Sequence, residues 1–368
     1  MDKIKLLFLT GIVGILTALT YYVFEFAVHN TIDLIWNTLL NTERYRWRVF
    51  PLSLTLTIVF FGFRHLLDKS TDRQESRSLG DGISEISIKN FTKVLFIGFW
   101  SLVAGASLGP EAILVPASVI LGMYLSAKVL PDQKETMDAM KGAGLSALFT
   151  AFFNSFIIGF LSLLLLSLRS DKTKINLQMI WIAIVASGAS IITLFIIGPS
   201  NQFFNWPEYS FKFRLVDLAI AVLLVLAGYL ITWSIYFSHN IAVYFRSFLL
   251  KYPWWIIAIS ASLGLSILYY AGGPLIEFTG NKSIKPLFLQ ASTLGIGGLI
   301  WILFLKILAI GWSKALWYRG GMIFPTFFVA SVIIAGVGQF YDEINFVLGI
   351  IAIMIGTLIA DRRANVLL

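Results

Sequence analysis

The sequence predicts an all-α protein that crosses a membrane several times. Of its 368 residues, 58% are hydrophobic and only 13% are charged, whereas a soluble domain has about 25% charged residues. Apolar runs long enough to span a bilayer recur along the chain. Two of these runs are interrupted at matching positions in the two halves of the chain, which is typical of transporters built from repeats.

The charge balance and the rarer residue types exclude several classes of function. The formal net charge of +8 fits Lys- and Arg-rich loops beside anionic membrane lipid. No basic stripe alternates with aromatic residues, so nucleic acid is not an expected partner. The chain has no Cys, and its three histidines lack metal-ligand spacing. Without an acid/base cluster, a serine triad or a phosphate-cradling motif, we expect neither an enzyme nor a cofactor.

The apolar runs give the predicted helices in order. Leu6–Val28 is too long for the hydrophobic region of a signal peptide, so we expect it to remain as the first membrane helix. Basic connections follow both this run and the next, so the positive-inside rule leaves the orientation open. Several runs exceed one perpendicular span, which predicts tilting or a hidden break. The other predicted helices are Pro51–Leu66, Gly142–Gly159, Ile180–Ile197, Leu215–Phe245, Trp254–Tyr270, Leu287–Leu316, Phe324–Phe340 and Phe346–Ala360.

The stretch Lys93–Ser126 is apolar but is broken at its middle by Gly105, Gly109 and Pro110. Gly and Pro interrupt a helix, and Pro110 suits the first position of a new one. Backbone N–H groups released at membrane depth persist only where they line a cavity or bind something. Because helix N-termini favour negative charge, we predict an anion site at this break.

The chain contains a second copy of this broken stretch. The segment 93–100, which reads K-V-L-F-I-G-F-W, matches 306–312, which reads K-I-L-A-I-G-W. Each copy is followed by a Gly-containing break, by Pro110 or Pro325, and by a helix that contains Ala-Ser-Val-Ile. Interrupted segments at corresponding places in two halves predict a binding site at the interface between the repeats.

Several polar side chains near the breaks are candidates for the site. Glu111 stands just inside a helix N-terminus, where it either caps the helix or, as an ionisable group at membrane depth, takes part in transport. Ser107 either donates a hydrogen bond to an anion or is an ordinary cap. Lys93 and Lys306 are interpreted as packed or snorkelling charges, with a role in the pathway as the alternative.

The order of these motifs resembles the CLC chloride channel and transporter family. The family signatures G-S-G-I-P, G-[R/K]-E-G-P and G-x-F-x-P each place a helix N-terminus on a chloride ion. In order, the similar segments here are Gly80–Glu85, Ala106–Pro110 and Gly321–Pro325, and Asn154–Gly159 is similar to part of the A-x-F-N-x-P-L-x-G segment. The set extends along almost the whole chain.

The resemblance implies a CLC-like fold with two inverted-topology repeats, about residues 1–200 and 210–368, and with re-entrant helices. Two such halves are expected to meet at the membrane midplane. The ion pathway implied in this way is lined by Gly80, Asp81, Gly82, Ile83, Ser107, Leu108, Gly109, Pro110, Glu111, Gly321, Met322, Ile323, Phe324 and Pro325.

The chain departs from the family at the positions that matter most for mechanism. Asp81 stands where the family has a serine that touches the ion, and Leu108 stands at the gating glutamate. The inner proton-relay glutamate falls near Leu165, so the usual proton coupling is not expected. Glu111, about one turn from Leu108, is a candidate replacement for the gate. The family's last helices would lie beyond Leu368, so the second repeat is expected to lack them.

We therefore expect passive transport of chloride or another small anion, without proton coupling, by a protein embedded in membrane lipid, and the resemblance implies a homodimer. The expected location is a bacterial plasma membrane. Two alternatives stay open: a non-conducting CLC-like protein with a structural or regulatory role, and a transporter of a different ion, because Asp81 and Glu111 would also suit a cation or protons.

Overall fold

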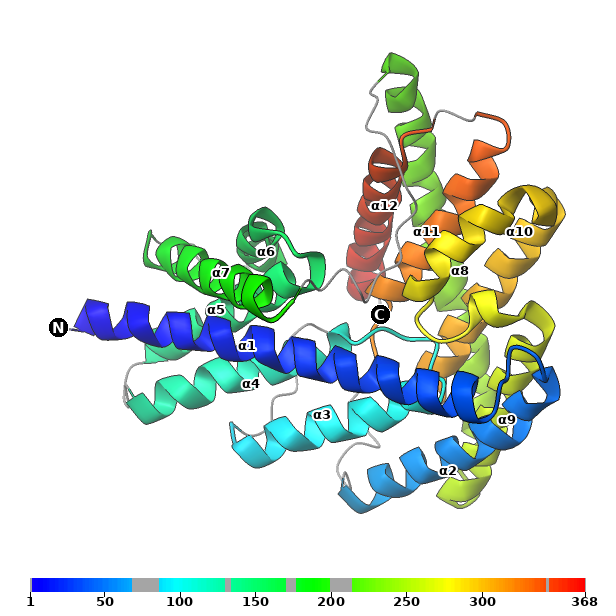
Figure 1. The fold of residues 1–368 in the computed structure, drawn as a ribbon, viewed down its shortest axis with the longest axis horizontal. Coiled ribbons are helices and arrows are strands. Elements are labelled where there is room, and N and C mark those ends of the chain that lie inside the picture. Colours follow the sequence, from blue (N-terminus) through cyan, green and yellow to red (C-terminus); the bar gives the residue numbers. More distant parts are fainter. Residues whose placement is uncertain are drawn as a thin grey trace. The chain divides into compact units, whose positions relative to one another are not determined.

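The computed structural model describes residues 2–67, 86–129, 134–169, 177–198, 214–341 and 344–367, and these residues form twelve α-helices (Figure 1). Within them, the only extended pairing is an isolated bridge between Gly109 and Gly321. Seven helical segments of the described chain are long and apolar enough to cross a membrane. The helices are α1 Asp2–Ile32, α2 Val49–Leu67, α3 Ile88–Val103, α4 Glu111–Val129, α5 Lys134–Phe153, α6 Phe156–Arg169, α7 Leu177–Ile197, α8 Leu215–Leu249, α9 Trp254–Gly272, α10 Ile284–Ala315, α11 Ile323–Gly338 and α12 Phe346–Leu367.

The predicted breaks are present, and the structure shows a further one, at Asn154, within a segment predicted as a single helix. The broken stretch separates α3 from α4, as predicted, and α10 contains a hidden break at Gly295, with φ 61° and ψ 179°. The prediction of a single helix over Gly142–Gly159 was wrong. The backbone at Asn154 takes a left-handed conformation, with φ 46°, so α5 ends before it and α6 begins after it. Asparagine tolerates this conformation better than most residues do.

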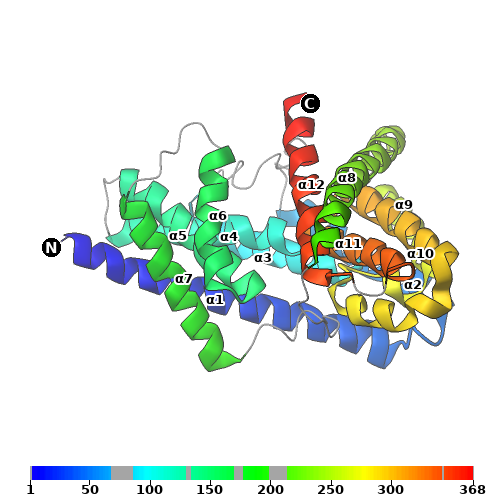
Figure 2. The ribbon, with the colours of Figure 1, turned by 90° about the horizontal axis from the view of Figure 1, so that it is seen from above.

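The chain divides into two compact units, and each is described by itself. The first unit comprises Met1–Asn30, Ser70–Phe99 and Ala112–Phe203. In its core, apolar residues of α1 pack against small and apolar residues of α5 and α7, and α5, α6 and α7 lie side by side in both ribbon views (Figures 1 and 2). A Cβ atom at Gly144 would collide with the carbonyl oxygen of Ser118. The small residues thus allow close helix packing.

The second unit comprises Thr31–Lys69, Trp100–Glu111 and Phe204–Leu368. Its longest helices, α8 and α10, pack against each other. Helix α12 also crosses α8, and at Gly228 the two backbones are so close that an added Cβ atom would collide with the carbonyl oxygen of Ile353. Small residues at such crossings are typical of membrane helices. This unit contains both predicted breaks, and therefore the whole described part of the candidate site.

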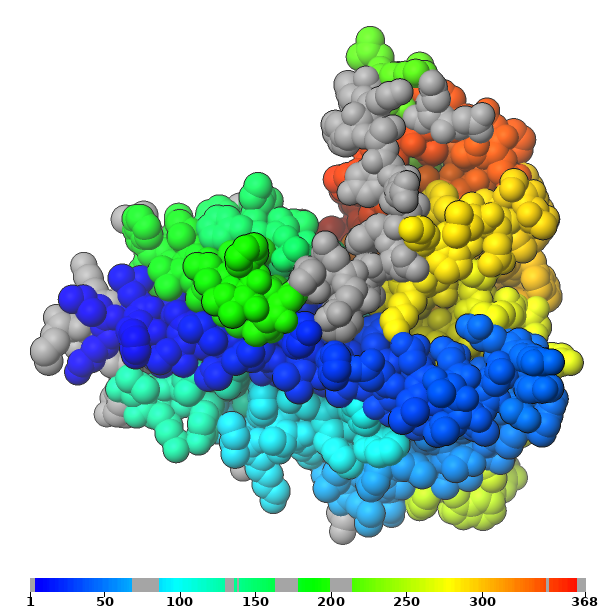
Figure 3. Space-filling view, in the orientation of Figure 1, coloured from blue at the N-terminus to red at the C-terminus, as the bar shows by residue number. Residues whose placement is uncertain are grey.

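Large apolar side chains are exposed along several helices. On α1 and α7, whose surfaces are coloured blue and green in Figure 3, Phe8 is 73% exposed and Phe195 is 89% exposed. A soluble monomer rarely exposes extended apolar patches. These surfaces agree with helices that face lipid.

Candidate anion site

The structure brings together two of the three predicted segments of the site. The first break, residues 104–110 between α3 and α4, meets the second break, residues 316–322 between α10 and α11. The backbone N–H of Gly109 donates to the carbonyl oxygen of Gly321, and the N–H of Gly321 donates to the carbonyl oxygen of Gly109, each over 2.8 Å. The third segment, Gly80–Ile83, lies outside the described residues.

The pairing of the two breaks requires glycine on both strands of the bridge. A Cβ atom at Gly109 would lie 2.9 Å from the Cβ of Phe324, and one at Gly320 would collide with the Cβ of Leu108. Because a side chain at either position would push the breaks apart, the glycines are explained by close backbone approach. The sequence repeat indicated that the breaks correspond, and the structure shows that they hydrogen-bond.

Glu111, the first residue of α4, places its carboxylate at the N-terminus of α11. Its Oε1 accepts a hydrogen bond from the backbone N–H of Ile323 over 2.6 Å, and its side chain is 3% exposed. Its Oε2 has no hydrogen-bond partner among the described residues. A free N–H at a helix N-terminus is a typical binding group for an anion. The carboxylate therefore occupies the kind of place that an anion would take.

Gly109 and Gly321, the two glycines of the bridge, make room for this carboxylate. A Cβ atom at Gly321 would collide with Oε1 of Glu111, and one at Gly109 would collide with Oε2. The carboxylate thus lies against both strands of the bridge.

Leu108, the residue at the family's gating position, is fully buried and packs in the first break. Its carbonyl oxygen accepts a hydrogen bond from Oγ1 of Thr279 over 2.8 Å. The backbone N–H of Ser107 donates to Oγ of Ser313 over 3.1 Å. Leu108 therefore acts as a packed core residue, and the ionisable side chain nearest to it in the sequence is Glu111.

The remaining predicted residues lie at the starts of the two helices that follow the breaks. Pro110 directly precedes α4, and Pro325 is the third residue of α11. The carbonyl oxygen of Met322 accepts hydrogen bonds from the N–H and the hydroxyl of Thr326. Phe324 is buried. Both helices thus begin at the place where the breaks meet.

Two aromatic residues that the sequence analysis missed support the first break. Trp36 lies on a π-helical segment, Asp33–Leu39, and its Nε1 donates to the carbonyl oxygen of Val103 over 3.0 Å. The hydroxyl of Tyr269 donates to the carbonyl oxygen of Gly105 over 2.6 Å. Short π-helical segments are frequent at functional sites. In a chain that is 15% aromatic, no sequence signal separates these two residues from the others.

A buried cluster of charges lies beside Tyr269. Nη1 of Arg46 forms a 2.7 Å salt bridge with Oε1 of Glu277, and Nη2 donates to the carbonyl oxygen of Tyr269. Burial raises the pKa of Glu277, and the guanidinium of Arg46 opposes that rise. Lys306 is also fully buried. Its interpretation as a packed charge is confirmed, whereas snorkelling toward solvent is wrong for this side chain.

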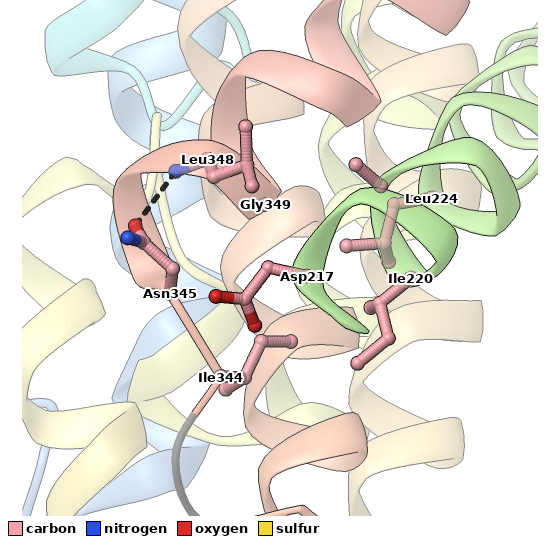
Figure 4. Close-up of a pocket in the computed structure, with 8 residues that line it drawn as sticks. Asp217, Ile220, Leu224, Ile344, Asn345, Leu348 and Gly349 are labelled. Carbon is pink, nitrogen blue, oxygen red and sulfur yellow. Dashed lines mark hydrogen bonds between the residues drawn. The ribbon is translucent and has the colours of Figure 1, made fainter. Parts of the chain in front are cut away.

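Another buried carboxylate lies in the second unit, but in surroundings that do not suit an anion pathway. Asp217 borders a cavity of about 10 Å³, and Figure 4 shows its carboxylate directed toward Ile344 and Asn345. Its Oδ2 accepts from the backbone N–H of Arg214, and Oδ1 has no partner among the described residues. A cavity of this size holds about one water molecule, and most of its lining is apolar. We interpret it as the joint between α8 and α12.

Comparison with known proteins decides the family. The sequence model described as voltage gated chloride channel matches residues 73–360. The chain belongs to the CLC family. Among the described residues of this CLC protein, no group of three or more acidic, His or Cys side chains could hold a metal ion.

Solved CLC structures share the fold of this chain. A CLC-type fluoride/proton antiporter matches with a TM-score of 0.68 at 17% identity, covering 98% of this chain and 89% of its own. A slow cyanobacterial Cl−/H+ antiporter matches with a TM-score of 0.69 at 16% identity, covering 98% and 93%. A eukaryotic CLC transporter matches at 0.66 and 14% identity, covering 98% and 72%. The predicted CLC fold is confirmed.

Curated relatives agree with the family. YfeO of Salmonella newport (strain SL254) and of Salmonella typhimurium (strain LT2), whose names refer to ion transport, are 25% identical over 256 residues, or 68% of this chain. The matched region spans 59% of the length of these relatives. Together with the seven apolar segments, the family makes the chain an integral protein of the plasma membrane, as predicted.

Proposed function

We propose that this CLC protein transports chloride or a similar small anion passively, through a site at the N-terminus of α11. The observation that supports the proposal is the hydrogen bond from the N–H of Ile323 to Oε1 of Glu111. A carboxylate held there is an anion that belongs to the protein itself, and a transported anion would have to replace it. The backbone of the two breaks would complete the described part of the pathway, and Gly80–Ile83 stays a predicted third segment.

The absence of proton coupling rests on the sequence. Leu108 and Leu165 stand at or near the positions where the family has its two proton-carrying glutamates, and neither side chain can bind a proton. One observation favours a second candidate, anion/proton exchange. Glu111 is buried and its Oε2 has no partner among the described residues, which is a place where a proton could bind when the carboxylate leaves α11.

The proposal is tested with purified protein in liposomes loaded with chloride. We expect chloride efflux when the membrane potential is released with a potassium ionophore, and we expect the efflux rate to change little when a proton gradient is imposed. Stoichiometric proton movement against that gradient would establish exchange instead. If the folded protein moves no anion, the non-conducting alternative holds.

Replacing Glu111 provides the sharper test. Glu111→Gln removes the competing charge at the N-terminus of α11, so we expect the dissociation constant for chloride to fall about tenfold, since a charge-assisted hydrogen bond contributes about 1.5–3 kcal/mol. Asp217→Asn, which neutralises the other buried carboxylate described above, is the matched control and should leave chloride binding unchanged. Equal chloride affinities in both variants and the wild type, measured by titration calorimetry, would contradict the role of Glu111.

We also propose that the protein is a homodimer with one pathway in each subunit, as the family resemblance implies. Cross-linking in native membranes, followed by denaturing electrophoresis, should give a product of twice the 41.1 kDa chain mass. Asp81→Ser, assayed for chloride flux in the same liposomes, tests whether the first signature belongs to the pathway. Removing a negative charge there should increase the flux.

A further inference from the structure

Lys306 is a cation buried completely within α10, a helix long and apolar enough to span the membrane. Its Nζ donates to the carbonyl oxygens of Ile276 and Phe278, over 3.0 and 2.6 Å, and lies 5.2 Å from the centre of the Phe328 ring. An ammonium group has three donors. Two carbonyl oxygens and the face of an aromatic ring therefore surround the ammonium group.

The carbonyls that Lys306 binds belong to a loop that supports the first break. The hydroxyl of Tyr269 accepts from the backbone N–H of Phe278 over 2.9 Å and donates to the carbonyl oxygen of Gly105. Next along the loop, Oγ1 of Thr279 donates to the carbonyl oxygen of Leu108. Lys306 thus connects through residues 276–279 to two backbone carbonyls of the break, including that of the residue before Gly109.

The charge of Lys306 is not cancelled by a direct ion pair. Among the described residues, no carboxylate forms a salt bridge with Lys306, and Glu277 on the same loop pairs with Arg46 at 2.7 Å. Removing a charge from water is expensive unless it is compensated. Ionisable groups kept at membrane depth are therefore candidates for function.

We infer that Lys306 is a positioning residue for the anion site, and that the charged form of its ammonium group raises the affinity of that site for anions. The ammonium holds the loop 276–279 against the first break, so that Gly109 pairs with Gly321 beside the N-terminus of α11. Its positive charge, close to the break, favours a negative ion there. This inference rests on the proposed function, because it concerns the same site.

The internal repeat provides the matched control. Lys93 occupies the place in the first copy that Lys306 occupies in the second, but it is only half-buried. A lysine-to-methionine change at each position removes the same charge and the same donors from equivalent places in the sequence. Any difference between the two variants therefore reports the surroundings of the buried lysine.

The test measures the dissociation constant for chloride by titration calorimetry, together with the thermal unfolding midpoint in detergent. We expect Lys306→Met to weaken chloride binding about tenfold, Lys306→Arg to stay within about threefold of the wild type, and Lys93→Met to change nothing. The larger guanidinium of Lys306→Arg disturbs the same pocket, so the unfolding midpoint of this variant should also fall. Its chloride affinity should nevertheless be kept, which separates the effect of the charge from a general loss of packing.

Chloride binding by folded Lys306→Met that equals that of the wild type would overturn the inference and leave the proposed function intact. A wild-type protein that neither binds nor transports anions would instead overturn the proposed function, and the inference with it. If Lys306→Met fails to fold, Lys306→Gln decides the matter, because it keeps a donor for the loop carbonyls but has no charge. Tenfold weaker binding supports the inference, and unchanged binding overturns it.

Discussion

The two breaks have similar sequences around them but differ in how many side chains from elsewhere bond to their backbone. In the first break and the turn before it, the backbone is bonded by side chains from distant parts of the second unit, namely Trp36, Tyr269, Thr279 and Ser313. In the second break and the residue before it, two side chains from elsewhere bond to the backbone: Nη1 of Arg246 donates to the carbonyl oxygen of Ala315, and Oγ of Ser101 accepts from the N–H of Arg319. The local bonding is alike, because three successive N–H groups at the start of each break donate to the last turn of the preceding helix.

This difference suggests a division of roles between the breaks. The second break has fewer side-chain contacts from elsewhere and presents the N-terminus of α11. The first break depends on the surrounding scaffold, and the helix that follows it contributes the carboxylate of Glu111. One repeat therefore supplies the donors and the other supplies the group that occupies them. Buried Lys306 and half-buried Lys93 show the same asymmetry.

The largest expected effect comes from filling the contact between the breaks. In Gly321→Ala the new Cβ atom would collide with Oε1 of Glu111, so either the carboxylate or the bridge must move. We expect the free energy of unfolding to fall by about 3 kcal/mol, the upper end for overpacking changes, because the contact joins two backbone segments and a buried carboxylate. The measurement is thermal unfolding in detergent, followed by tryptophan fluorescence.

Gly336→Ala is the control for this change, because Gly336 lies on α11, the helix that follows Gly321, and the nearest neighbour of a new Cβ atom there would be 4.0 Å away. Alanine is favoured over glycine within a helix by up to about 1 kcal/mol, so this variant should be as stable as the wild type or more stable. Equal losses of stability in the two variants would show that Gly321 is not needed for close approach.

The sequence was sufficient to predict the features that depend on local residue pattern. Hydropathy predicted the helices, Gly and Pro predicted both breaks, and the repeat indicated that the breaks correspond. Glu111 was identified from its position at a helix N-terminus. Its acceptor role toward Ile323 could not be predicted, because the donor is a backbone N–H and every residue except proline has one.

The residues that hold the first break could not be predicted for the same reason. Trp36, Tyr269 and Lys306 all bond to backbone carbonyls, and such partners leave no mark in the sequence. Most side-chain hydrogen bonds in proteins are of this kind. The break at Asn154 was missed because apolar residues continue on both sides of it, although asparagine favours helix ends and turns over helix interiors. Its left-handed backbone marks the end of α5.

A smaller effect is expected from removing one scaffold contact of the first break. Tyr269→Phe deletes the hydroxyl that joins the carbonyl oxygen of Gly105 to the N–H of Phe278. Two backbone groups then lose their partner, so the free energy of unfolding should fall by about 1–3 kcal/mol. Tyr270→Phe, at the exposed neighbouring position, should have no effect. If both variants unfold at the wild-type temperature, the first break does not depend on its scaffold.

The smallest effect is expected from removing one of the two side-chain contacts described above for the second break. Oγ of Ser101 accepts from the N–H of Arg319 over 2.6 Å, and Ser101→Ala removes that acceptor. Since Arg319 is only half-buried, water can replace the lost partner, and the free energy of unfolding should fall by about 0.5–1.5 kcal/mol. Ser234→Ala, at an exposed position of α8, is the control and should unfold like the wild type. A loss from Ser101→Ala larger than that from Tyr269→Phe would reverse the comparison, because the second break would then depend on distant side chains more than the first.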